Sequence, residues 1–166
     1  MELNWGVGSL QGKKNRPNED RYRLLHSDIP LVFKSGRGQL FAVFDGIGSA
    51  PRGGPAAQQM CDALIEFFRK GTRYKADAGS LKELLISFNL EIKNWGFIPG
   101  TTRTLGGCAG TIAWFYGTQV YLFHAGDTVG YLFKGEDLTQ LTKEHGSGKF
   151  IDNYFGLGAN MFIDSL

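Results

Sequence analysis

The sequence LFAVFDGIG at residues 40–48 sets the expectation for the fold. Its first five residues are apolar without alternation, which is typical of a strand covered on both faces. The strand ends at Asp45, and Gly46 behind it carries no side chain that would block a ligand. Two interpretations follow: a carboxylate delivered to a metal or phosphate site, or a simple Asp-Gly turn.

Length and composition indicate a single globular domain over residues 1–166. Hydrophobic residues at 42% and charged residues at 20% are typical of neither disordered nor membrane-spanning chains. A net charge of +2 is too small to indicate nucleic-acid binding. Residues 1–4 lack the regions of a signal peptide, and no apolar run reaches membrane-helix length. We therefore expect a cytoplasmic protein with neither nucleic acid nor membrane as a partner, in which Cys61 and Cys108 are reduced core residues.

Strand signals occupy both ends of the chain. Residues 3–10 have the weak pattern of a strand, and residues 22–24 alternate as a half-buried strand would. A loop is expected over residues 34–38, before the apolar strand. Residues 111–142 predict an antiparallel meander with turns at glycines.

Helical periodicity fills the middle of the chain. One amphipathic helix is expected after Pro55, ending near Gly71. A second is expected from Ser80, whose hydroxyl would cap it together with Glu83 in a capping box. Strands, two adjacent helices and strands again indicate an α+β protein with helices laid over antiparallel sheet.

Acidic residues stand at three junctions between strands and loops: Glu19-Asp20, Asp45 and Asp127. Carboxylates at strand ends can converge at one edge of a sheet, where oxygen ligands suit Mg²⁺ or Mn²⁺. With two ions, a bridging carboxylate permits in-line attack on phosphorus, and Asp45 is the natural bridge. Taken alone, Glu19-Asp20 suits an exposed acidic loop, and Asp45 and Asp127 suit simple Asp turns.

The motifs around these residues resemble those of the PPM or type-2C metal-dependent serine/threonine protein phosphatases. Residues 12–22, with Asn18-Glu19-Asp20 inside them, are similar to that family's first motif, and residues 41–48 to its second. Residues 110–145, with Asp127 inside them, resemble its central strand block. The resemblance implies an antiparallel β-sandwich flanked by helices in α-β-β-α layers, here lacking the family's C-terminal strands.

The resemblance also assigns roles to individual residues. Glu19, Asp45 and the carbonyl of Gly46 would hold one metal ion, and Asp45 would bridge to a second. Asp20 would orient metal-bound water, and Asp127 matches the position of an additional, weaker metal site.

Three departures from the family's pattern affect the expected activity. Asn15 stands where the family has a phosphate-binding arginine, so Arg16 or Lys14 must substitute, and Arg16 is our candidate because a guanidinium can bind two phosphate oxygens. Ile47 stands where many relatives carry a histidine proposed as a general acid. The two further aspartates of the family's second metal site have no counterpart, so we expect one Mn²⁺ or Mg²⁺ here against two in the family.

Two functions follow from these observations. The first is a metal-dependent phosphatase that hydrolyses phosphoserine or phosphothreonine in a phosphorylated protein through a metal-activated water. The second is a non-catalytic phosphatase-like module that binds a partner or senses phosphorylation, or an inactive fragment. Either function is compatible with a second chain that completes the sheets.

Overall fold

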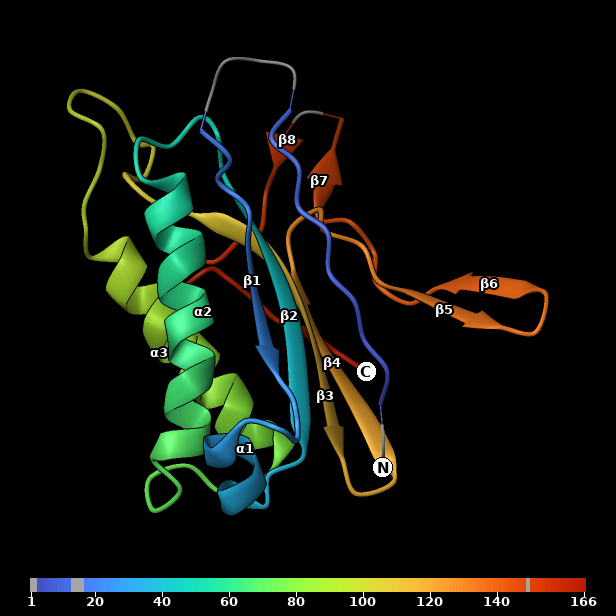
Figure 1. The fold of residues 1–166 in the computed structure, drawn as a ribbon. Coiled ribbons are helices and arrows are strands. Elements are labelled where there is room, and N and C mark those ends of the chain that lie inside the picture. The colour runs from blue at the N-terminus through green and yellow to red at the C-terminus, as the bar shows by residue number, and fades with distance from the viewer. Residues whose placement is uncertain (1–2, 13–16, 149) are drawn as a thin grey trace.

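One antiparallel sheet with two helices on one face organises the chain. The computed structural model describes residues 3–12, 17–148 and 150–166. In chain order its elements are β1 (Arg21–Leu25), α1 (Pro30–Ser35), β2 (Gln39–Gly46), α2 (Gly53–Arg69), α3 (Ala78–Lys93), β3 (Cys108–Tyr116), β4 (Gln119–Ala125), β5 (Tyr131–Lys134), β6 (Asp137–Gln140), β7 (Gly146–Ser147), β8 (Phe150–Ile151) and β9 (Asp164–Ser165). The main sheet has the order β1-β2-β3-β4-β9, and α2 and α3 pack on one side of it (Figure 1). The predicted α+β class is confirmed.

The core lies between this sheet and the two helices. Side chains from β2 and β3 meet those of α2 and α3 in one cluster of buried residues. Its largest fully buried members are Trp114, Phe44, Phe67, Phe123 and Phe155. Helices α2 and α3 correspond to the two predicted amphipathic helices, each beginning two residues before the predicted start. None of the described helices is long and apolar enough to cross a membrane.

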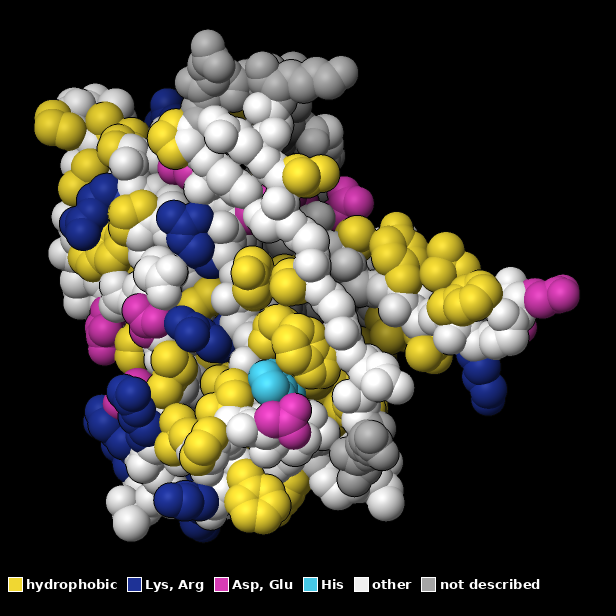
Figure 2. Space-filling view, viewed as in Figure 1, with side chains coloured by type: hydrophobic (Ala, Val, Ile, Leu, Met, Phe, Trp, Pro, Cys, Tyr) yellow, Lys and Arg dark blue, Asp and Glu magenta, His cyan; other side chains and the backbone are white. Residues whose placement is uncertain are grey.

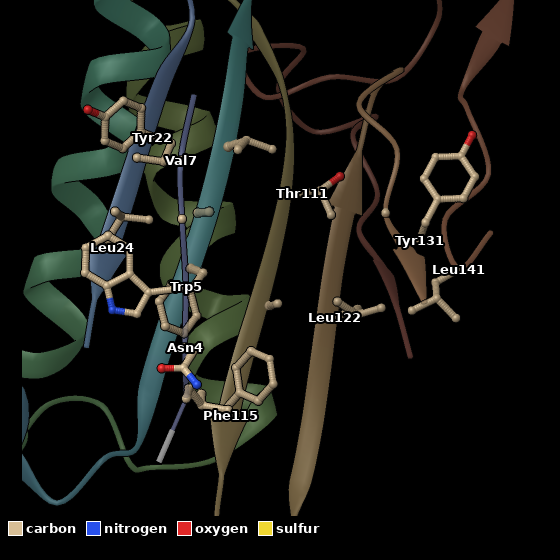
Figure 3. Close-up of a pocket in the computed structure, with 17 residues that line it drawn as sticks. Asn4, Trp5, Val7, Tyr22, Leu24, Thr111, Phe115, Leu122, Tyr131 and Leu141 are labelled. Atoms are coloured by element: carbon tan, nitrogen blue, oxygen red, sulfur yellow. The ribbon is translucent and has the colours of Figure 1, made fainter. Parts of the chain in front are cut away.

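Strand β2 is covered on one face, so the prediction that both of its faces are covered is wrong. Leu40, Ala42 and Phe44 are buried toward the helices, whereas Val43 on the other face is 47% exposed. Successive side chains of a strand point to opposite faces, and the opposite face here meets the N-terminal segment rather than a full second sheet. A cavity of about 390 Å³ remains there, between residues such as Trp5 and Val7 and the strands (Figure 3).

Three further local predictions differ from the structure. Residues 3–10 pair with none of the described strands. Helix α1 occupies part of the expected loop at residues 34–38, and Gly36 ends it with a positive φ of 64°. Strands β5 and β6 pair with each other rather than continuing the meander, and their hairpin projects away from the main sheet (Figure 1).

Helix α3 is capped by Asp77 rather than by Ser80. The backbone of Asp77 is extended, and its carboxylate accepts a hydrogen bond of 2.7 Å from the backbone N–H of Ser80. A carboxylate three residues before Ser80 thus takes the cap position that the sequence pattern assigned to the Ser80 hydroxyl, and it also faces the positive end of the helix dipole.

Replacing Asp77 with alanine is expected to lower the free energy of unfolding by about 1 kcal/mol, because the N–H of Ser80 loses its partner. Urea unfolding followed by circular dichroism measures the change. The matched control is Glu136→Ala in the exposed turn between β5 and β6, where we expect a change within about 0.5 kcal/mol. Equal losses in both variants would contradict the assigned cap.

Candidate functional site

The registers of the main sheet bring the predicted acidic residues to one edge. One row of paired residues crosses this edge: Arg21, Phe44, Gly110 and Ala125. Asp20 directly precedes the row, Asp45 follows it on β2, and Asp127 follows it beyond β4. Because neighbouring strands are antiparallel, the start of β1, the end of β2 and the end of β4 coincide. The convergence expected from the sequence is therefore present.

The electrostatics of this edge centre on Asp45. Partial burial of its carboxyl, followed by the charge of Asp20 and then that of Asp127, raises the pKa of Asp45 to about 6. Glu19 adds a smaller contribution in the same direction. A side-chain interaction with Asp20 also raises the pKa of Asp45.

This crowding of carboxylates fits a divalent cation. A cation placed among them would relieve the repulsion that contributes to the raised pKa of Asp45. Oxygen donors are the ligands that Mg²⁺ and Mn²⁺ prefer. In the part of the chain that the structure describes, no group of three or more Asp, Glu, His or Cys side chains is already arranged to hold an ion.

The loop that carries Glu19 and Asp20 is braced by its neighbours. Asn18 donates a hydrogen bond of 2.8 Å to the Ser9 hydroxyl and accepts one of 2.9 Å from the N–H of Asp20. Arg21 donates to the carbonyls of Asn18 and Asp20, at 2.9 and 2.7 Å. The sequence analysis gave no role to Ser9, Asn18 or Arg21. The Asn-x-Asp spacing of an Asx turn could have indicated Asn18, whereas Ser9 is brought close only by tertiary structure.

The side chain of Glu19 connects its loop to the first turn of α2. Its Oε1 accepts a hydrogen bond of 3.3 Å from the N–H of Gly54, where the helix dipole favours a negative charge. Gly46 packs directly against the same turn, because a Cβ on it would lie 2.5 Å from the backbone carbon of Gly53. The contact keeps the end of β2 close to the start of α2, with Glu19 beside both.

A cavity of about 250 Å³ opens at the acidic edge. Asp20 and Asp45 line it, together with Ser9, Arg21 and Thr128. It is large enough for a few water molecules and an ion. The predicted phosphate-binding residue Arg16 and its alternative Lys14 lie outside the described residues, so their role stays a prediction.

His145 fixes the turn that presents Asp127. The N–H of Gly126 and the side-chain amide of Asn153 both donate to Nδ1 of His145, at 3.1 and 2.8 Å. Two donors on Nδ1 place the ring proton on Nε2, which donates to Asp164 at 2.9 Å. The partners of His145 come from segments 8 and 19 residues away in the sequence, so no local pattern indicates them. Asn153 is itself buried, so its side chain is part of a buried network.

Replacing His145 with leucine is expected to lower the free energy of unfolding by about 1–3 kcal/mol, because the buried N–H of Gly126 loses its acceptor. His145→Asn is the matched control, since its side-chain oxygen can take the place of Nδ1. We expect a smaller loss for asparagine and slower amide exchange at Gly126 than in the leucine variant. Equal losses in the two variants would contradict this role.

Cys61 and Cys108 are core residues, as predicted, and His124 is buried in the core as well. His124 is buried and contacts the Thr111 hydroxyl and the Lys143 carbonyl, both at 3.0 Å. Burial, followed by the neighbouring His145, lowers the pKa of His124. Both cysteines are free and buried; burial raises the pKa of Cys61 to about 12 and that of Cys108 well above its ordinary value. Protonated thiols are poor nucleophiles and poor metal ligands.

Solved structures share the fold of this chain. The chain is similar to a bacterial serine phosphatase at 19% identity with a TM-score of 0.72, over 93% of this chain and 66% of that one. It is similar to the serine/threonine phosphatase Stp1 from Staphylococcus aureus at 15% identity with a TM-score of 0.73, over 100% and 74% of the two chains. It is also similar to the catalytic domain of the serine/threonine protein phosphatase PstP, in complex with two manganese ions, at 26% identity with a TM-score of 0.60, over 82% and 54%.

These structures confirm the phosphatase-like fold class, and the chain spans about two thirds of the length of the bacterial serine phosphatase, 66%. No curated protein sequence matches the chain significantly. A family model described as Protein phosphatase 2C matches residues 7–165. Because this match includes Glu19, Asp20, Asp45 and Asp127 and spans nearly the whole sequence, the chain belongs to the protein phosphatase 2C family.

Proposed function

We propose that the chain is a Mg²⁺- or Mn²⁺-dependent protein phosphatase that hydrolyses phosphoserine and phosphothreonine in phosphorylated proteins. The observation that carries the proposal is the register of the main sheet, which brings Asp20, Asp45 and Asp127 to one edge, where a divalent cation would stabilise their carboxylates. Family membership supports a phosphatase, and the manganese ions of the PstP structure support the choice of metal. The free cysteines fit a reducing cytoplasm.

Each residue of the site has a part in the proposed reaction. A bound divalent cation supplies a Lewis acid and lowers the pKa of water. Asp45, the carbonyl of Gly46 and the carboxylate of Glu19 would hold it, and Asp127 would serve a further, weaker site. Asp20, which lines the same cavity as Asp45, would orient water and accept a proton. Ile47 cannot donate a proton, so the leaving alkoxide would take its proton from solvent.

Phosphate release from phosphoserine and phosphothreonine peptides, measured against Mn²⁺ concentration, tests the proposal. We expect release that depends on Mn²⁺ and falls in Asp20→Asn. The matched control is Asp137→Asn, a carboxylate on the exposed strand β6, which should keep the activity. A folded chain that releases no phosphate at any Mn²⁺ concentration would contradict the proposal.

A non-catalytic phosphatase-like module is the second candidate. It is favoured by Asn15 and Ile47, and by the lack of a preassembled group of three metal-binding side chains in the described ranges. Isothermal titration calorimetry separates the two candidates. Tight binding of two ions supports the phosphatase, whereas one weak ion or none, with phosphopeptide binding but no turnover, supports the module. Native mass spectrometry would also test whether a second chain completes the sheets.

A further inference from the structure

A basic groove lies beside the acidic cavity, between the first turn of α2 and the end of α3. It encloses about 660 Å³. Arg21 and Arg52 supply its positive charge, and Pro55, Phe88 and Trp95 supply apolar surface. In the space-filling view, Lys and Arg side chains are spread over the side of the molecule that the helices form, with Asp and Glu side chains among them (Figure 2). Nothing in the proposed hydrolysis uses Arg52, Phe88 or Trp95.

The groove adjoins the site where phosphate would be hydrolysed. Arg21 lines both the groove and the acidic cavity. Gly54, which also lines the groove, donates its N–H to the carboxylate of Glu19. A peptide whose phosphorylated residue reaches the acidic cavity would therefore place a neighbouring residue in the groove.

The guanidinium of Arg52 is positioned by Trp95. Its guanidinium carbon lies 3.9 Å from the ring centre of Trp95, in a cation–π contact that limits the rotamers of a long side chain. No carboxylate of the described residues forms an ion pair with Arg52. The first turn of α2 carries no acidic side chain of its own, and the carboxylate that reaches it, that of Glu19, accepts from the N–H of Gly54 rather than from Arg52.

Among the described residues that line the groove, only Asp62 is acidic, and its carboxylate is already engaged. Asp62 pairs with Arg23 at 2.9 Å and accepts a hydrogen bond of 3.0 Å from Gln58. Its charge is therefore offset by Arg23, and the charges of Arg21 and Arg52 are left for a ligand. Pro55 and Phe88 can contact the methylene groups of an acidic side chain whose carboxylate meets Arg52.

We propose that this groove binds an aspartate or glutamate close to the phosphorylated residue of the protein substrate, with Arg52 on Trp95 as its main contact. The proposal rests on the proposed function, because it gives that phosphatase site a preference for acidic substrates. Arg52 is a specificity-determining residue for the substrate and takes no part in the hydrolysis.

Two matched phosphoserine peptides test the proposal, one with glutamates and one with glutamines beside the phosphoserine. We expect the wild-type chain with Mn²⁺ to prefer the glutamate peptide about fivefold in kcat/KM, through KM, and Arg52→Ala to reduce this ratio to about one. Arg52→Lys should give an intermediate ratio, because lysine keeps the charge and loses the planar stacking. The control is Arg69→Ala at the far end of α2, which should keep the ratio.

Fluorescence anisotropy with the same two labelled peptides provides a readout that does not need turnover. If the chain turns over no substrate but binds the glutamate peptide more tightly through Arg52, the groove is supported and the proposed function fails. If the wild-type chain does not distinguish the two peptides in either measurement, or if Arg52→Ala leaves the ratio unchanged, the groove proposal is wrong.

Discussion

The Asp45→Asn variant is expected to be more stable than the wild-type chain without metal and less stable than it with Mn²⁺. Without metal at pH 8, the carboxylate of Asp45 is charged among the carboxylates of Asp20, Asp127 and Glu19, and asparagine removes that repulsion. We expect a gain of about 1 kcal/mol in the free energy of unfolding, reduced from the full effect of the shift because Asp45 is in contact with solvent. Mn²⁺ then stabilises the wild type more than the variant, because the variant lacks a charged ligand.

The stability difference between Asp45→Asn and the wild type should depend on pH. The pKa of Asp45 is raised from 3.8 to about 6 in the folded chain, so the folded state holds this proton more tightly than the unfolded state. The contribution of protonated Asp45 to the stability of the wild-type chain is complete below pH 3.8 and is lost as the pH rises through about 6. The difference between the variant and the wild type should therefore be close to zero at pH 3.5 and largest above pH 7.

Urea unfolding at pH 3.5 and pH 8, with and without Mn²⁺, measures the differences in free energy of unfolding between the variant and the wild type. On the proposed function, the same variant should lose about 10²-fold or more in Mn²⁺-dependent phosphate release. Asp137→Asn on β6 is again the control, and it should change neither stability nor metal response. If Mn²⁺ stabilised Asp45→Asn as strongly as the wild type, Asp45 would not be a metal ligand.

Replacing Trp114 with alanine is expected to lower the free energy of unfolding by about 3–5 kcal/mol. Trp114 is fully buried, and its ring stacks on Tyr116 at 5.0 Å and meets Phe67 edge to face at 5.3 Å. Its Nε1 donates a hydrogen bond of 2.7 Å to the carbonyl of Arg37. Alanine would leave a large cavity and an unpaired carbonyl, and the loss is a large part of the stability of an ordinary domain.

Trp114→Phe separates the two contributions, because phenylalanine keeps ring contacts and loses the hydrogen bond to Arg37. We expect an intermediate loss, of which about 1–3 kcal/mol comes from the unpaired carbonyl. Phe33→Ala is the control, since Phe33 is 78% exposed. Denaturant unfolding followed by fluorescence of the remaining tryptophans measures all three variants. A Trp114→Ala loss within 1 kcal/mol of the Phe33→Ala value would contradict the central place of Trp114 in the core.

Local sequence patterns predicted the elements whose stability depends on residues close in the chain. Apolar spacing identified α2 and α3, and alternation with glycine turns identified β3 and β4. The same patterns failed where partners are distant or a nearby competitor is stronger. Asp77 caps α3 in place of Ser80, and β5 pairs only with β6 rather than with β4.

The candidate site was likewise predicted from the sequence only in part. The sequence by itself determined that carboxylates stand where three strands begin or end, because side-chain identity and strand boundaries are local properties. Only the tertiary structure decided that one register row brings Asp20, Asp45 and Asp127 to the same edge and raises the pKa of Asp45.

Tertiary structure alone also decided the contacts that support the site. His145 holds the turn before Asp127, and Arg52 lies on Trp95 beside the first turn of α2. It decided as well that one face of β2 is open, although the apolar run at residues 40–44 suits a strand covered on both faces. The physical reason is the same in each case. The polarity of a side chain determines which kind of environment stabilises it, and only the folded chain determines which residues supply that environment.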